Sequence, residues 1–137
     1  MTIRILVVQD HSPLGDLAVE KAFQLASTED AAVLHVLAIP AMPGDADQRE
    51  TLDDDLMALA HLGRRLGIAV DGAVIETPDT QRIAEEIRQR QINHLVIAKP
   101  SGQNGDTAIS RMLDAAAEAT GIATTVVHET GGSDVTP

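Results

Sequence analysis

The sequence predicts a single α/β domain, built as one doubly wound, five-stranded parallel sheet with helices on both faces. Three observations predict it. Five short apolar runs alternate with four segments in which apolar residues recur at helical spacing. The apolar runs are nearly continuous, as in strands buried on both faces. The 137 residues contain no internal repeat and no linker, which suits one domain. We expect residues 1–128 to form this domain and residues 129–137 a flexible C-terminal tail.

The first strand and helix are marked by a change from a continuous apolar run to helical periodicity. Residues 3–8 are apolar and rich in β-branched side chains, and they end at a polar group, residues 9–12. This pattern indicates a buried strand followed by a loop. Ser12 suits an N-cap and Pro13 suits the first helical position. Apolar residues then recur at helical spacing to about Ser27.

The second strand and helix follow in the same way. Residues 32–39 indicate a strand, closed by two prolines and a glycine. Leucines recur at helical spacing from Leu52 to Leu66 and predict a helix that ends at Gly67. The acidic run 53–55 lies near the expected start, where negative charge suits the positive end of the helix dipole.

The third strand is expected at residues 68–75, and the segment 77–79 is expected to start the third helix. Ile83, Ala84 and Ile87 recur at the spacing of the inner face of that helix.

The last third of the chain supplies two strands and one helix. Residues 94–98 indicate the fourth strand, and a polar, glycine-containing loop follows at residues 100–105. A fourth helix is expected at about residues 107–120, ended by Gly121. Ala123–His128 indicates the fifth strand.

The expected strand order is 3-2-1-4-5, because right-handed crossovers between parallel strands produce a doubly wound sheet. Ligands of such sheets bind outside the carboxyl ends of the strands, where the strand order reverses. In this order the reversal lies between the first and fourth strands. The loops at residues 10–12 and 99–105 would then face each other across a crevice.

Composition excludes several classes of function. Ten basic and 21 acidic residues give a net charge of −11, which repels nucleic acid and anionic lipid. This charge suits solubility, and a saline habitat fits it too. Phe23 is the only aromatic residue, so no base-stacking platform exists. Cysteine is absent, which excludes disulfides and thiolate chemistry. The longest early apolar run is too short for a signal peptide or a membrane span. We therefore expect a cytoplasmic protein without membrane insertion.

No catalytic motif is present, so we expect no enzyme and no metal site. The chain has neither a Gly-x-Ser-x-Gly nor a His-Glu-x-x-His motif. Residues 102–105 lack the Lys-Ser/Thr of a P-loop, although they lead into a helix N-terminus, a generic anion site. The opening strand and residues 98–100 also resemble a response-regulator receiver domain. In such a domain the phosphoacceptor aspartate ends the third strand, whereas here that strand runs into Glu76.

Four segments of the chain match one family in order and spacing. They are residues 5–13, 33–36, 77–83 and 94–98. The first resembles that family's opening strand and Asp-Gly-Ser turn, with His11 replacing the glycine. The others resemble the His-Val of its second strand, the start of its third helix and the strand before its nucleotide loop. On these matches the chain resembles the universal stress protein family, from residue 3 to about residue 128.

The resemblance implies a site for an adenine nucleotide, either ATP or AMP. The family's nucleotide-binding positions fall on Asp10, Val36, Ala98, Lys99 and Gly102. Asp10 also suits a turn-forming aspartate. Val36 also suits ordinary core packing.

The family's ATP signature is only partly retained. Its nucleotide-binding branch carries Gly-x-x-Gly, followed at a fixed spacing by Gly-Ser or Gly-Thr. Lys99 takes the place of the first glycine and Gly102 keeps the second. The final pair falls on Met112-Leu113, or on Ser110-Arg111 when counted back from the last strand. Because glycine lets a backbone approach phosphate closely, these side chains would fill that space. Lys99 could instead supply charge to a phosphate.

We expect a non-enzymatic stress-response or regulatory protein that acts through protein contacts. The alternative is an ATP or AMP sensor that uses the crevice. A third hypothesis, an enzyme of the related adenine-nucleotide hydrolase-like group, lacks a nucleophile or metal constellation. The sequence leaves open the stress, the protein partner and whether the chain was cut from a larger transporter or kinase.

The expected assembly is a homodimer through the last strand, Ala123–His128. In the expected order this strand is a sheet edge, and it carries neither lysine nor proline to block pairing. A twofold axis would pair the two copies antiparallel. The resemblance points the same way, because universal stress proteins commonly dimerise through this strand. A monomer kept apart by its negative charge is the alternative.

Overall fold

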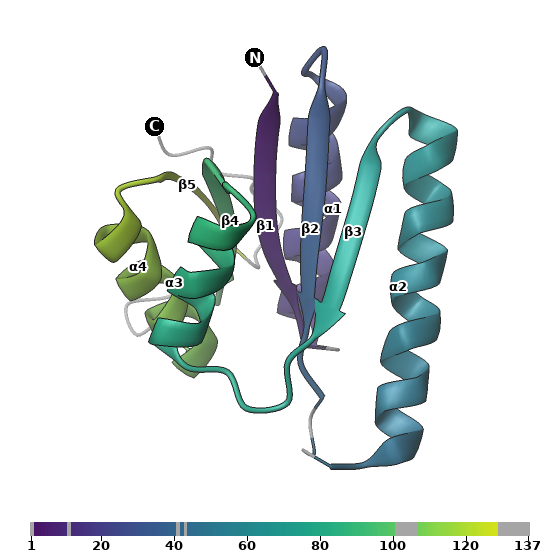
Figure 1. The fold of residues 1–137 in the computed structure, drawn as a ribbon, viewed down its shortest axis with the longest axis vertical. Helices are drawn as coiled ribbons and strands as arrows, with labels where there is room; N and C mark the ends of the chain where they lie inside the picture. The colour runs from purple at the N-terminus through teal and green to yellow at the C-terminus, as the bar shows by residue number, and fades with distance from the viewer. Residues whose placement is uncertain (1, 11, 41, 43, 101–106, 129–137) are drawn as a thin grey trace.

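The computed structural model describes residues 2–10, 12–40, 42, 44–100 and 107–128. Strands and helices alternate along the chain (Figure 1). The elements are β1 (Ile3–Gln9), α1 (Pro13–Ser27), β2 (Ala32–Ala38), α2 (Ala46–Leu66), β3 (Ala69–Val74), α3 (Thr80–Gln89), β4 (His94–Lys99), α4 (Ala108–Thr120) and β5 (Ala123–His128).

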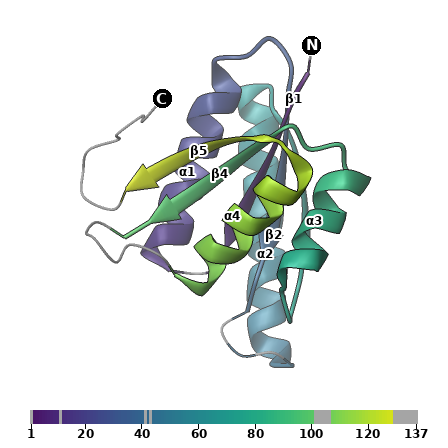
Figure 2. The same cartoon turned by 90° about the vertical axis from the view of Figure 1, so that its left-hand side faces the viewer.

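The five strands form one parallel sheet in the order β3-β2-β1-β4-β5. This confirms the predicted fold class and strand order. Helices α1 and α2 cover one face, and α3 and α4 cover the other (Figures 1 and 2). The expected tail, residues 129–137, lies outside the described residues.

An apolar cluster fills the space on each face of the sheet. On one face Leu6, Leu95 and Ile97 pack with residues of α3 and α4. On the other face Val7 and Val36 pack with residues of α1 and α2. Because successive strand residues point to opposite faces, a sheet covered on both faces must be apolar at nearly every position. This is the physical reason for the continuous apolar runs in the sequence.

The predicted helix ends agree with the caps that the structure contains. Pro13 opens α1, and the Ser12 side chain accepts a hydrogen bond from the backbone N–H of Gly15. Helices α2 and α4 end at Gly67 and Gly121, whose φ angles are 76° and 69°. Glycine is favoured at both positions because these angles are left-handed.

The second helix is longer than the leucine pattern predicted. It begins at Ala46, with Asp45 as its N-cap, and it has 21 residues. Residues 53–55 therefore lie in the middle of α2, and the prediction that they complement its dipole near the start is wrong. The leucine pattern failed here because the first turns of α2 are solvated and need no apolar face. No helix in the described part of the chain, α2 included, is long and apolar enough to cross a membrane.

Candidate functional site

The strands β1 and β4 separate near their carboxyl ends. They pair only from Ile5 opposite His94 to Val7 opposite Val96, although both strands continue beyond this register. A cavity of about 230 Å³ lies beside the point of separation. It occupies the predicted reversal of strand order, and we call it the switch-point cavity.

Two strand ends and two helix N-termini line the switch-point cavity. The lining residues are Val8, Asp10, Leu14, Gly15, Ala18, Val96, Ala98, Thr107, Ala108, Ile109 and Leu113. Among the lining residues that the structure describes, Asp10 and Thr107 alone have polar side chains. Because α1 and α4 cover opposite faces of the sheet, their N-terminal turns meet only beyond its edge, at this cavity.

The structure brings some of the predicted nucleotide-binding residues together and separates others. Asp10 and Ala98 line the switch-point cavity. Val36 is fully buried in the cluster beneath α1, as its alternative role in core packing requires, and is not among the described lining residues. Lys99 is the last residue of β4, and its ammonium forms an ion pair with Asp114 of α4. Gly102 lies outside the described residues.

Sequence reasoning missed the helical part of the lining. Leu14 and Ala18 come from α1, and Thr107 and Ile109 come from the start of α4. A usable signal existed, because these two helices follow the two strands at the switch point. Their first turns must therefore start at the same edge of the sheet as the loops.

The N-terminal turn of α1 is held by the aspartate that precedes it. Asp10 Oδ1 accepts hydrogen bonds from the Ser12 backbone N–H, at 3.1 Å, and from the Ser12 hydroxyl. Ser12 Oγ in turn accepts from the Gly15 N–H, at 3.1 Å. A Cβ on Gly15 would lie 2.7 Å from Asp10 Oδ1, so only glycine allows this close approach of helix and strand.

The N-terminal turn of α4 is closed by a capping box. Thr107 Oγ1 accepts from the Ser110 backbone N–H, at 3.0 Å, and Ser110 Oγ accepts from the Thr107 N–H, at 2.8 Å. Each residue thereby satisfies a donor that an anion would otherwise contact.

The substituted motif positions have structural partners. The Lys99 ammonium lies 2.8 Å from a carboxylate oxygen of Asp114 on α4. In the gapless alignment of the motif, Met112 packs partly buried against the core and Leu113 is buried in the cavity wall. In that alignment Lys99 lies in an ion pair and the final pair is apolar, whereas in the alternative alignment Ser110 is buried in the capping box and Arg111 is exposed.

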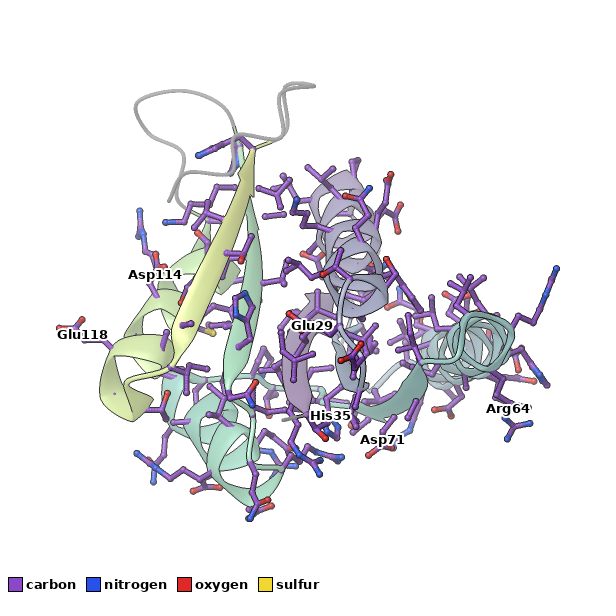
Figure 3. The ribbon with its side chains drawn as sticks, turned by 90° about the horizontal axis from the view of Figure 1, so that it is seen from above. Glu29, His35, Arg64, Asp71, Asp114 and Glu118 are labelled. Atoms are coloured by element: carbon purple, nitrogen blue, oxygen red, sulfur yellow. The ribbon has the colours of Figure 1, made fainter. Side chains whose placement is uncertain are left out.

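A second polar cluster lies on the α3 side of the sheet, at its amino end. His35 of β2 is buried, and its Nδ1 lies 3.4 Å from Arg90 Nη1 and 3.5 Å from Asp71 Oδ2. Arg90 also binds the buried carboxylate of Glu86, with 2.6 Å between Arg90 Nε and Glu86 Oε2. Figure 3 shows His35 and Asp71 next to each other. No set of three or more His, Asp or Glu residues in the described part of the chain is arranged to hold a metal ion.

The buried imidazole predicts a loss of stability in acid. Burial lowers the pKa of His35 from its ordinary value of 6.5, and the charge of Arg90 lowers it further, against the opposing effects of Asp71 and Glu86. Arg4 also lowers it. Below pH 6.5 the unfolded chain therefore binds a proton that the folded chain resists. The contribution of the neutral His35 to the free energy of unfolding is fully present above pH 6.5. It is lost as the pH falls from 6.5 toward the lowered pKa of the folded state.

Urea denaturation measured across this range tests the prediction. His35→Gln should flatten the fall in stability below pH 6.5. Burial also lowers the pKa of His94, so His94→Gln should remove part of the remaining slope. His61 is exposed, and His61→Gln is the matched control. If the stability of His35→Gln falls with pH as steeply as that of the parent protein, His35 is not the cause of the acid sensitivity.

The fold and the switch-point cavity define the class of protein, a doubly wound α/β domain with a candidate ligand site where its strand order reverses. The chain belongs to the universal stress protein family, whose sequence model matches residues 1–116. No curated protein matches it with significant similarity.

Solved structures of this family share the fold. A universal stress protein family protein from Burkholderia pseudomallei is 18% identical, with a TM-score of 0.63 over 90% of this chain and 94% of that one. A family protein from Arabidopsis thaliana with AMP bound is 10% identical, with a TM-score of 0.60 over 96% and 97%. A universal stress protein from Archaeoglobus fulgidus in complex with dAMP is 9% identical, with a TM-score of 0.62 over 92% and 97%.

Proposed function

We propose that this chain is a cytoplasmic, non-enzymatic regulatory protein of the stress response that acts as a homodimer through protein contacts. The observation that carries the proposal is the open edge of β5. This strand pairs with β4 on one side and with no other described strand. Ala123 and Thr124 are exposed, and the strand has no lysine or proline. Natural sheets usually block an edge of this kind unless it pairs with another chain.

The opposite edge of the sheet supports the choice of β5. Strand β3 contains Asp71 and Gly72, both exposed. A charged side chain and a glycine weaken pairing at an edge. The two edges therefore differ in the way expected if only β5 associates with a second copy.

The oligomeric state tests this proposal. Thr124→Lys places a charge at the expected twofold interface, where a lysine also approaches from the other copy. We expect light scattering to report a monomer of about 14.5 kDa, in place of a dimer of twice that mass. Val126→Pro, which would remove a backbone donor from the same strand, should have the same effect where it folds.

A matched control uses the other edge. Ala69 is exposed on β3, so Ala69→Lys makes the same type of change there and should leave the dimer intact. Circular dichroism of each variant confirms the fold. A dimer of unchanged mass in Thr124→Lys, or a monomeric parent protein, would refute the interface.

An adenine-nucleotide sensor is the second candidate function. It is favoured by the family structures with AMP and dAMP and by the position of the switch-point cavity. Thermal shift with ATP, AMP and Mg²⁺ tests it, because a bound ligand must raise the stability by mass action. No stabilisation at millimolar nucleotide would reject this function.

A further inference from the structure

Another cavity, of about 360 Å³, lies at the carboxyl end of the edge strand β3. Its lining residues are Arg49, Val74, Ile75, Glu76, Thr77, Asp79 and Arg82. It shares none of these residues with the switch-point cavity, and β2 separates β3 from β1 in the sheet. We call it the β3-end pocket, and it is a candidate site apart from the reversal of strand order.

The described lining of the β3-end pocket carries two positive and two negative charges. Arg49 comes from the start of α2 and Arg82 from the first turn of α3. Glu76 and Asp79 come from the connection between β3 and α3. This balance contrasts with the net charge of −11 of the whole chain. The field of the chain repels a ligand of net negative charge, whereas a neutral ligand with separated charges meets no such repulsion.

The two carboxylates of the pocket are fixed by backbone donors. Glu76 Oε1 accepts a hydrogen bond from the Gly44 N–H, at 3.0 Å, which ties the segment before α2 to the end of β3. Asp79 Oδ1 accepts from the Arg82 N–H, at 2.7 Å, and caps α3. Each carboxylate has a second oxygen and further lone pairs. Both can therefore accept hydrogen bonds from a cationic group of a ligand and keep their bonds to the backbone.

The two guanidinium groups of the pocket are held loosely. Arg49 Nη1 lies 3.8 Å from Glu76 Oε2, which is beyond hydrogen-bond distance. Arg82 Nη2 lies 3.3 Å from Glu86 Oε1. The two arginine side chains are 51% and 52% exposed. Because each guanidinium carries five N–H donors in a planar fork, both groups have donors to offer to the two oxygens of a ligand carboxylate.

We infer that the β3-end pocket binds a free α-amino acid with an uncharged, aliphatic side chain. The carboxylate of the amino acid lies against the two guanidinium groups, and its ammonium group donates to the two fixed carboxylates. Val74 and Ile75 supply the aliphatic part of the wall for its side chain. The cavity volume falls within the roughly 300–1,000 Å³ of small-molecule sites. This inference goes beyond the proposed function, because dimerisation through β5, at the other edge of the sheet, requires no ligand.

L-Leucine and two analogues are matched probes for the charge requirement. Isocaproate has the same carbon chain without the ammonium group, and isoamylamine has it without the carboxylate. We expect calorimetry on the full chain at neutral pH to show leucine binding at millimolar concentration or below. Each analogue should bind at least about tenfold more weakly, because it leaves one pair of charges in the pocket without a partner. Failure of leucine to bind at millimolar concentration, or isocaproate binding as tightly as leucine, would overturn the inference.

Variants of the lining test the location of the site. Arg49→Gln removes a guanidinium that has only an exposed ion pair, and it should weaken leucine binding at least about tenfold. Arg64→Gln is the matched control, because it removes the same charge from an exposed position about four turns, or roughly 22 Å, further along α2. Circular dichroism of each variant confirms the fold. Unchanged leucine binding in Arg49→Gln, or an equal loss in Arg64→Gln, would refute the site.

A third variant tests the role of the fixed carboxylates. Glu76→Gln keeps an oxygen for the Gly44 N–H and removes the negative charge. It should weaken the binding of leucine but not that of isocaproate, which has no ammonium group. An equal effect on both probes would contradict the assigned orientation of the ligand. None of these results bears on the mass of Thr124→Lys, so failure here and failure of the proposed dimer are distinguishable.

Discussion

Replacing Arg90 with methionine is expected to lower the free energy of unfolding by about 3–5 kcal/mol. The Glu86 side chain is only 8% exposed, and Arg90 donates a hydrogen bond to it at 2.6 Å. Arg90 also binds Asp71 on β3. Without Arg90, the buried carboxylate of Glu86 keeps Arg82 as its cationic partner in the described part of the chain, and the side chain of Arg82 is half exposed. Urea denaturation at neutral pH measures the loss.

Two further variants separate the buried charge from other causes. Adding Glu86→Met to Arg90→Met should recover most of the loss, because an apolar pair has no uncompensated charge to bury. Arg88 lies on the same helix but is exposed, so Arg88→Met should change stability by less than about 0.5 kcal/mol. If the double variant is no more stable than Arg90→Met, the explanation by a buried Glu86 carboxylate left with only the half-exposed Arg82 fails.

Replacing Gly63 with alanine is expected to lower the free energy of unfolding by about 2 kcal/mol. A Cβ at this position of α2 would lie 2.6 Å from the carbonyl oxygen of Ile68 and 2.4 Å from Val70 Cγ2. Alanine raises helix propensity by about 1 kcal/mol over glycine. The steric cost should exceed this gain, because the Ile68 carbonyl belongs to the backbone that leads into β3 and cannot move alone.

The second variant for this site is Gly63→Ala combined with Val70→Ala. It removes the side-chain clash and leaves the backbone clash, so we expect the pair to remain less stable than Val70→Ala alone. Thermal denaturation of the four proteins completes the cycle. A Gly63→Ala variant as stable as the parent would show that α2 does not pack tightly on β3.

Sequence reasoning succeeded for the strands and for the helix ends because local chemistry controls them. The continuous apolar runs, Ser12 with Pro13, and the glycines at 67 and 121 all act within a few residues of their own positions. It failed at the start of α2, where the helix begins after its N-cap Asp45 without an apolar period.

The candidate site was predictable in position but not in composition. Asp10 follows from the end of the first strand at the switch point and Ala98 from the family resemblance, and the structure places both in the cavity wall. Ile109 and Leu113 belong to the wall only because α4 lies against the sheet at a particular angle. The spacing of apolar residues in the sequence does not specify the angle at which α4 packs on the sheet.

The sequence by itself determined the order of the elements, the parallel sheet and the family of this protein, since these depend on spacing and apolar pattern. The tertiary structure alone decided the electrostatic state of the cavity. The fold places Lys99 in an ion pair with Asp114. Asp10 is then the charged residue among the described residues of the cavity wall. The reason is physical: a charge acts through its distance from other charges, and distances between residues far apart in sequence exist only after the chain has folded.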